Sequence, residues 1–218
     1  MNILQQLMEK AWLTPQGVVL APAVAGRVKI SKTKLGLWVF LSVVTVLFLL
    51  LLVAYAGRMA FEDWRPGPDI GLLWFNTLAL LCSSIAMQWA TIAVRRGQID
   101  DAWSGLMTGG LLACVFLAGQ VMAWRQLASM GTFSATVPAV TFFYLITVLH
   151  ALHILGGLVA WGMTTARLLR GDAVVKIQQS IELCTVYWHF MFGVWVVLFG
   201  LLFSGNNLSA VLAFCGLR

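Results

Sequence analysis

The sequence Phe142-Phe143-Tyr144-Leu145-Ile146-Thr147-Val148-Leu149-His150-Ala151-Leu152-His153-Ile154-Leu155-Gly156-Gly157 contains no charged residue. It belongs to an uncharged stretch that exceeds the roughly 20 residues a helix needs to cross a lipid bilayer. Two histidines lie in it one helical turn apart, and the third histidine of the chain, His189, lies in another such stretch. Ionisable groups are costly in hydrocarbon and rare there. The sequence therefore predicts a membrane helix whose histidines need an explanation.

The composition of the chain agrees with a membrane protein. Of its 218 residues, 61% are hydrophobic and 10% are charged, whereas soluble chains carry about 25% charged residues. The mean hydropathy is +0.90. The charges fall in clusters, and the uncharged stretches between them are 35–57, 70–94, 102–124, 126–166 and 183–217. This pattern excludes an ordinary soluble domain.

The uncharged stretches predict five membrane spans, at about 35–57, 70–94, 103–124, 137–163 and 183–204. The fourth stretch is too long for one span, but residues 128–136 are rich in turn formers and Pro138 suits the first turn of a helix. Ser204-Gly205-Asn206-Asn207 ends the last span. The expected fold is an all-α integral membrane bundle of five transmembrane helices, formed by residues 35–218.

The basic residues predict the orientation of the bundle. They gather before the first span and after the second and the fourth, at Arg27, Lys29, Lys32, Lys34, Arg95, Arg96, Arg167, Arg170 and Lys176. Cytoplasmic loops carry an excess of Lys and Arg, so we expect a cytoplasmic N-terminus and a periplasmic C-terminus. The net charge of +6 then reflects topology, and no nucleic-acid partner is expected.

Residues 1–34 are expected to form a cytoplasmic segment. Residues 1–12 place apolar side chains on one helical face and polar ones on the other, which is typical of an interfacial helix or of a helix that docks on a partner. They have no basic start and no apolar core, so no cleavable signal peptide is expected. The four cysteines show no metal-ligand spacing, and we expect buried small side chains and no disulfides.

Two patterns predict close packing between helices. Small residues recur in two rows of the third span, Gly105 with Gly109 and Ala113, and Gly110 with Cys114 and Ala118. Such rows let membrane helices approach closely. The second span carries a polar stripe, formed by Asn76, Ser83, Ser84, Gln88 and Thr91. We expect these side chains to form hydrogen bonds between helices; a proton path is the alternative, but the stripe has no titratable group.

Three histidines and Glu182 are the residues that could carry chemistry. A bis-histidine haem would need His150 or His153 opposite His189, and a metal site would need the histidine pair with Glu182. A proton relay is a third alternative. We expect instead that the four groups form a hydrogen-bonded polar seam between the fourth and fifth spans, because unpaired polar groups are costly in hydrocarbon. No catalytic, cofactor-binding or metal-binding residue is expected.

Several motifs together resemble subunit III of the haem-copper oxidases. The stretch 141–157 is similar to the penultimate helix of that family, with its paired histidines. Glu182-Leu183-Cys184-Thr185-Val186-Tyr187-Trp188-His189-Phe190, followed by Trp195, is similar to the last helix. Asn76-Thr77 with Leu81, Ser83 and Ser84, and Gly36–Ser42, also resemble helices of the family, and Phe116–Gln120 is a weaker match. The resemblance covers residues 35–205 in order and fits the shorter, five-helix form of the family.

This resemblance implies a non-catalytic subunit of a respiratory oxidase in a bacterial inner membrane, where the complex reduces oxygen to water and translocates protons. Haem and copper would belong to the partner chains, the catalytic subunit I and subunit II. The chain would stabilise subunit I, bind phospholipids and support proton uptake. The candidates for a structural polar seam or for lipid contact are His150, His153, Glu182, His189, Trp188, Asn76 and Gln120.

The sequence departs from the family pattern at its membrane carboxylates. Val43 and Val44 stand where the family usually has Glu, Met191 and Phe192 stand where it often has Asp, and Ala123 replaces a further Glu. These differences argue against direct proton transfer through the first span. They leave open an accessory or assembly protein of a nitric oxide reductase or a related enzyme. A small transporter is another alternative, against which the lack of an inverted repeat speaks.

Overall fold

The computed structural model describes residues 32–59, 61, 71–129 and 138–203. The expected helix at residues 1–12 and the end of the last span at 204–207 lie outside these residues. The described part contains five helices: α2 (Lys32–Met59), α3 (Leu72–Arg95), α4 (Ile99–Ser129), α5 (Pro138–Leu169) and α6 (Val174–Phe203). Each is long and apolar enough to cross a membrane. The prediction of an all-α protein with five spans is confirmed, and the orientation of the termini stays a prediction.

Several helices are longer than the expected spans. The largest difference is at the start of α6, which begins at Val174 and not near residue 183. Charged residues marked the ends of the expected spans, but a helix satisfies its own backbone groups and can continue beyond the hydrocarbon. Charge clusters therefore indicate where the apolar layer ends and not where a helix ends.

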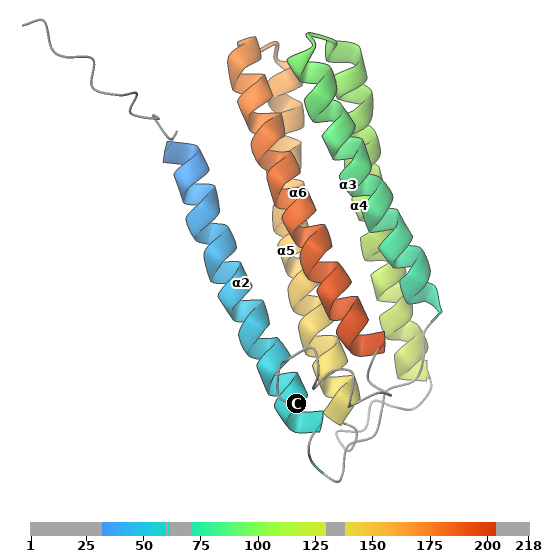
Figure 1. Ribbon diagram of the computed structural model, residues 1–218. Helices are drawn as coiled ribbons and strands as arrows, with labels where there is room; N and C mark the ends of the chain where they lie inside the picture. The colour runs from blue at the N-terminus through green and yellow to red at the C-terminus, as the bar shows by residue number, and fades with distance from the viewer. Residues whose placement is uncertain (1–31, 60, 62–70, 130–137, 204–218) are drawn as a thin grey trace, which may run out of the picture. The chain divides into compact units, whose positions relative to one another are not determined.

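Helices α3, α4, α5 and α6 form an up-and-down four-helix bundle, and α2 packs beside α5 and α6 (Figure 1). The pairs α3/α4 and α5/α6 are hairpins with very short connections. Each connection contains a glycine with a positive φ, 76° at Gly97 and 67° at Gly171. The next backbone N–H returns to the preceding helix, from Gln98 to Ala93 O and from Asp172 to Arg167 O. This left-handed helix end favours glycine.

Glycines of α4 bring it close to its neighbours. A Cβ atom at Gly105 would lie 2.9 Å from the backbone oxygen of Ala86 and 2.9 Å from the backbone nitrogen of Ala90. A Cβ atom at Gly109 would lie 2.7 Å from the side-chain sulfur of Met87 and 3.3 Å from the backbone oxygen of Ser83. The expected packing role of this row is confirmed. The second row differs, since Gly110 faces Trp161 of α5 while Cys114 and Ala118 are exposed.

Buried aromatic residues join the four helices of the bundle. Each of four indole N–H groups donates to an oxygen on another helix. Trp188 reaches Ser83 Oγ at 2.8 Å and Trp195 reaches Thr77 Oγ1 at 2.9 Å. An indole ring can be buried at little cost when its single polar atom is satisfied. The contacts of Trp188 and Trp195 hold α6 against α3, and those of Trp124 and Trp161 join α4 and α5.

Candidate functional site

The polar stripe of α3 faces its neighbours, as expected. Ser83 Oγ donates to Gly109 O at 2.6 Å, and Thr91 Oγ1 lies 2.8 Å from Thr185 Oγ1. Asn76 Nδ2 donates to Gln120 Oε1 at 3.3 Å. Ser84 and Gln88 both contact α6. The prediction that this stripe forms hydrogen bonds between helices is confirmed.

His189 is held by α3. Its Nε2 lies 2.9 Å from Gln88 Oε1, and its Nδ1 is hydrogen-bonded to Ser84 Oγ. An amide oxygen only accepts, so Nε2 carries a proton, and in a neutral ring Nδ1 then accepts from the Ser84 hydroxyl. The neutral ring is thereby satisfied at both nitrogens. His189 nevertheless stays exposed on the outer surface of the bundle.

Glu182 lies at the end of the bundle where α2 begins. Arg95 Nε of α3 donates to its carboxylate at 2.9 Å, and Gln178 donates at 3.2 Å. Lys34 Nζ of α2 lies 3.9 Å from the same carboxylate. One carboxylate thus links three helices through two basic residues, with its side chain 19% exposed.

The histidine pair of α5 points in two directions. His150 is fully buried among the rings of Phe48, Phe116 and Trp195, and neither ring nitrogen has a hydrogen-bond partner among the described residues. His153 faces Phe48 and Phe40 of α2, and its Nδ1 lies 2.8 Å from Leu149 O of its own helix. Residues three apart on a helix point about 60° apart, which is enough to place one in the core and the other toward α2.

The expected seam of His150, His153, Glu182 and His189 is therefore wrong. The described residues contain no hydrogen bond between any two of them. His189 and Glu182 pair with α3, and the two α5 histidines lie among aromatic rings or bond within their own helix. The physical reason is that α3 offers the side chains that pair with His189 and Glu182, whereas the polar side chain that α5 offers to α6, Arg167, pairs with Ser180.

The remaining candidates serve the interior of the bundle. Trp188, Asn76 and Gln120 are at most 2% exposed. Asn76 and Gln120 share one hydrogen bond, which leaves Asn76 Oδ1 and Gln120 Nε2 without a partner among the described residues. These side chains pack between helices, where lipid does not reach. Among the described residues, no group of three or more His, Cys, Asp or Glu side chains could hold a metal ion.

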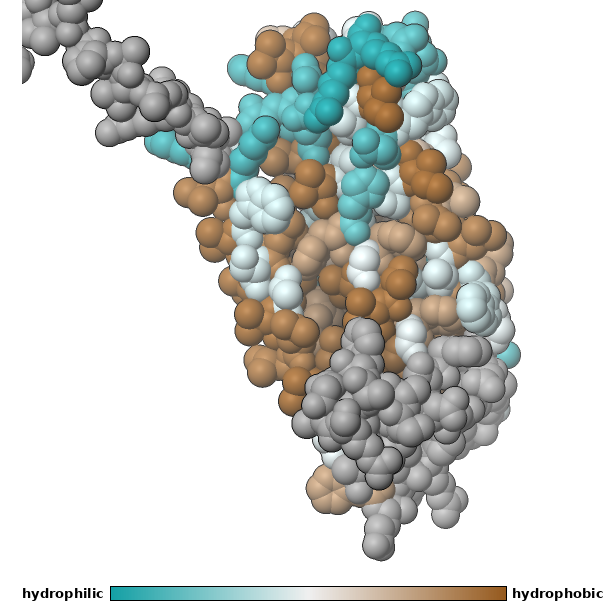
Figure 2. All heavy atoms as spheres, in the orientation of Figure 1, coloured by the Kyte–Doolittle hydropathy of each residue, from teal (hydrophilic) through white to brown (hydrophobic). Residues whose placement is uncertain are grey.

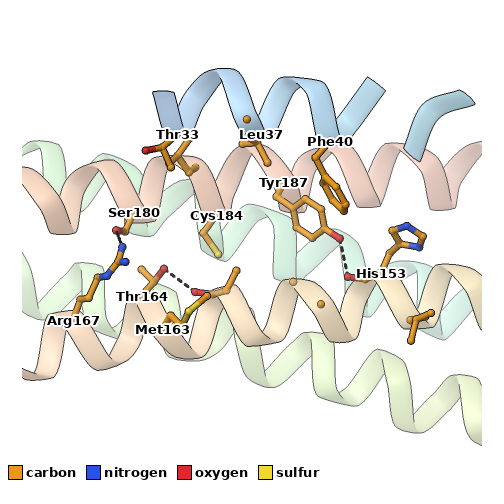
Figure 3. A pocket seen from close by; sticks show the side chains of 16 residues that line it. Thr33, Leu37, Phe40, His153, Met163, Thr164, Arg167, Ser180, Cys184 and Tyr187 are labelled. Carbon is orange, nitrogen blue, oxygen red and sulfur yellow. Dashed lines mark hydrogen bonds between the residues drawn. The ribbon is translucent and has the colours of Figure 1, made fainter. Parts of the chain in front are cut away.

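A groove separates α2 from α5 and α6 at the end near Glu182 (Figure 3). Its volume is about 680 Å³, and its lining is mostly apolar. Leu37 and Phe40 of α2 face Cys184 and Tyr187 of α6 across it. Arg167 lies at one end, where its Nη1 donates to Ser180 Oγ at 2.6 Å. Apolar walls with one cation at the end suit an amphipathic ligand.

Sequence reasoning missed three contacts around this groove and its neighbourhood. Arg95 binds Glu182, Arg167 binds Ser180, and the Tyr187 hydroxyl donates to His153 O at 2.7 Å. A hydrogen bond from Tyr187 could have been predicted from the sequence, because a buried tyrosine hydroxyl usually has a partner. The pairing of Arg95 with Glu182 could not be read from two residues so far apart in the sequence.

The fold and these contacts define a class of protein: a multi-pass helical membrane protein whose polar side chains mainly join its own helices. The family described as "Cytochrome c oxidase subunit III" matches residues 27–205, which include all five helices. The chain belongs to this family, whose members are third subunits of multi-subunit haem-copper oxidases.

Individual relatives agree with the family match. The chain is 29% identical over 174 residues to "Cytochrome c oxidase subunit 3" of Thermostichus vulcanus, covering 78% of this chain and 85% of the relative. It is 29% identical over 164 residues to "Probable cytochrome c oxidase subunit 3" of Mycobacterium bovis, covering 70% and 81%. "Heme-copper oxidase subunit I+III" of Aeropyrum pernix is 25% identical over 182 residues, covering 78% of this chain and 22% of that protein.

Proposed function

We propose that the chain is a non-catalytic subunit that packs against the haem-bearing subunit I of a terminal oxidase in a bacterial inner membrane. The complex reduces oxygen to water and translocates protons, and haem and copper belong to subunits I and II. The family match across all five helices carries this proposal. Hydrogen bonds between helices occupy Ser83, Thr91 and Glu182. These side chains therefore stabilise the bundle, which supports the non-catalytic role.

The partner is proposed from the relatives. The name "subunit I+III" assigns both subunits to one protein in Aeropyrum pernix. This chain is similar to part of that fused protein. We therefore expect it to pack against a separate subunit I. The chain would stabilise that partner and sustain its proton uptake without supplying a proton-transfer residue of its own.

A phospholipid is the proposed ligand of the groove beside α2. Its volume of about 680 Å³ and its apolar walls fit acyl chains. Arg167 at one end offers a cation for the phosphate, and guanidinium groups bind phosphate well. The tail would lie between Leu37 of α2 and Tyr187 of α6. The lipid would then fill the space that the α2 side chains leave open.

Purification of the tagged chain in a mild detergent tests the main proposal. We expect a haem-bearing subunit to co-purify in equimolar amount, with the visible absorption bands of haem and with oxygen uptake in the presence of an electron donor. The chain separated from that partner should show no visible absorbance. Recovery of the chain without any haem protein would contradict the proposal, and nitric oxide consumption in place of oxygen uptake would redirect it to a nitric oxide reductase.

A further inference from the structure

The outer face of α6 differs from the outer face of α5. From Val186 onward its exposed residues follow one helical stripe, Val186, His189, Gly193, Val196, Val197 and Gly200. We call this stripe, together with exposed Gln88 of neighbouring α3, the α6 outer face. It lies at the front of Figure 1, between α2 and α3. The outward stripe of α5 is instead made mainly of large aliphatic residues, Leu145, Val148, Leu152, Leu155 and Val159, with one exposed glycine, Gly156, beside them.

Hydrophilic groups reach far down this face. Figure 2 shows a teal strip that starts at one end of the bundle and runs between α6 and α3 toward mid-height, with brown surface on either side. His189 lies seven residues beyond Glu182, which is about 10 Å along the helix axis. Glu182, with its two basic partners, marks the end of the apolar layer on this side of the bundle. His189 and Gln88 therefore lie at a depth where lipid offers only hydrocarbon.

The polar groups of the α6 outer face are only partly satisfied. His189 uses both ring nitrogens, with Ser84 and Gln88. Gln88 accepts through Oε1, and its Nε2 amide group has no acceptor among the described residues. Because Gln88 is exposed, the two N–H groups of that amide are directed to whatever covers the face. Acyl chains cannot accept a hydrogen bond, whereas a protein oxygen can.

The two glycines of the face have no packing role within the described chain. A Cβ atom at Gly193 or Gly200 would meet nothing within 4 Å. Gly105 and Gly109, by contrast, meet α3 at van der Waals distance or closer. Exposed glycines on a membrane helix permit the close approach of another helix. The two glycines of α6 and the Gln88 amide of α3 are independent observations, and both indicate that another helix covers this face.

From these observations we infer that the α6 outer face binds a transmembrane helix of the haem-bearing subunit, which passes along Gly193 and Gly200 and presents an oxygen acceptor to Gln88 Nε2. This inference rests on the proposed function, which supplies the partner. Lipid is the expected neighbour of α5, whose outward stripe is uniformly apolar.

Photo-crosslinking within the intact, purified complex tests the inference. A benzophenone amino acid at Val197, 45% exposed, should crosslink the chain to the haem-bearing subunit. The same residue at Val159 on α5, 65% exposed, is the matched control and should crosslink lipid only. A Val197 product with lipid alone, or with another protein, would overturn the inference while leaving the proposed function intact. Failure of the wild-type chain to co-purify with a haem protein would overturn both.

A pair of glycine variants gives a second measurement. Gly193→Leu should lower the amount of haem recovered per chain by about fivefold, since the branched side chain blocks close helix approach. Gly57→Leu on α2 is the matched control, because its Cβ also meets nothing within 4 Å, and it should retain the haem. Both variants should unfold at the wild-type temperature. Equal haem recovery from the two variants would contradict the inference.

Discussion

The contact between α3 and α4 differs from the contact of α2 with α5 and α6 in the size of the residues that face each other. Small residues such as Gly105 let the backbones of α3 and α4 touch. Large residues such as Leu37, Phe40 and Phe48 stand between α2 and the bundle, and a groove of about 680 Å³ remains beside them. The first contact is complete within the chain, whereas the second leaves space for another molecule. Membrane helices thus pack tightly where backbones can approach.

Filling the tight contact should have the largest effect. Gly105→Leu would place a side chain against backbone atoms of Ala86 and Ala90, which cannot turn away as a side chain could. We expect a loss of about 3 kcal/mol in the free energy of unfolding, at the upper end for overpacking. Denaturant titration of the purified chain in detergent, followed by circular dichroism, measures it. Gly57→Leu is the control, and equal stability of the two variants would contradict the assigned contact.

Removing a hydrogen-bond relay from the same contact should have a smaller effect. Ser83 receives a bond from Trp188 of α6 and donates one to Gly109 of α4. Ser83→Ala leaves a buried indole N–H without an acceptor and should cost about 1–2 kcal/mol. Ser42→Ala is the matched control, because among the described residues the Ser42 hydroxyl donates only to Trp38 O of its own helix. If both variants unfold at the same denaturant concentration, the relay contributes nothing.

Filling the groove should change lipid content and leave the stability of the bundle nearly unchanged. Gly36 lines the groove, and a Cβ there meets nothing within 4 Å. Gly36→Phe should lower the phospholipid retained per chain, while the free energy of unfolding stays within about 0.5 kcal/mol. Phosphorus analysis of the complex, after loosely bound lipid has been washed away with detergent, measures the lipid that is retained. Native mass spectrometry measures it independently. Unchanged lipid in Gly36→Phe, compared with Gly57→Phe, would exclude the groove as the site.

The tight contacts could be predicted from the sequence, whereas the partners of the histidines could not. Hydrogen bonding by Asn76, Ser83 and Thr91 followed from their spacing on one helix, because unpaired polar groups are costly between membrane helices. The five spans followed from the absence of charge. Both are local properties of a single helix.

The relative rotation of the helices is not a local property. Nothing in the sequence around His189 indicates that its partners are Ser84 and Gln88, about a hundred residues earlier. Likewise, the spacing of His150 and His153 does not reveal which of them enters the core. The rotation of each helix follows from how all the large side chains pack together. The prediction of a polar seam was wrong because it assumed this rotation for α5 and α6.

Little change in stability is also expected at His150, where neither ring nitrogen has a hydrogen-bond partner among the described residues. His150→Leu loses ring contacts with Phe116 and Trp195, which are worth about 0.5–1.5 kcal/mol. It also removes a polar ring from an apolar site, which is favourable by a similar amount. The two changes offset each other, so the free energy of unfolding should change by less than about 1 kcal/mol.

His189→Leu is the comparison for His150→Leu. It leaves the Ser84 hydroxyl and the Gln88 amide unpaired and should cost about 1–2 kcal/mol. Denaturant titration of the two variants under the same conditions measures the difference. A loss of more than about 3 kcal/mol for His150→Leu would resemble the breaking of a buried polar pair. That result would contradict the apolar environment assigned to this ring and would show that it depends on a polar partner.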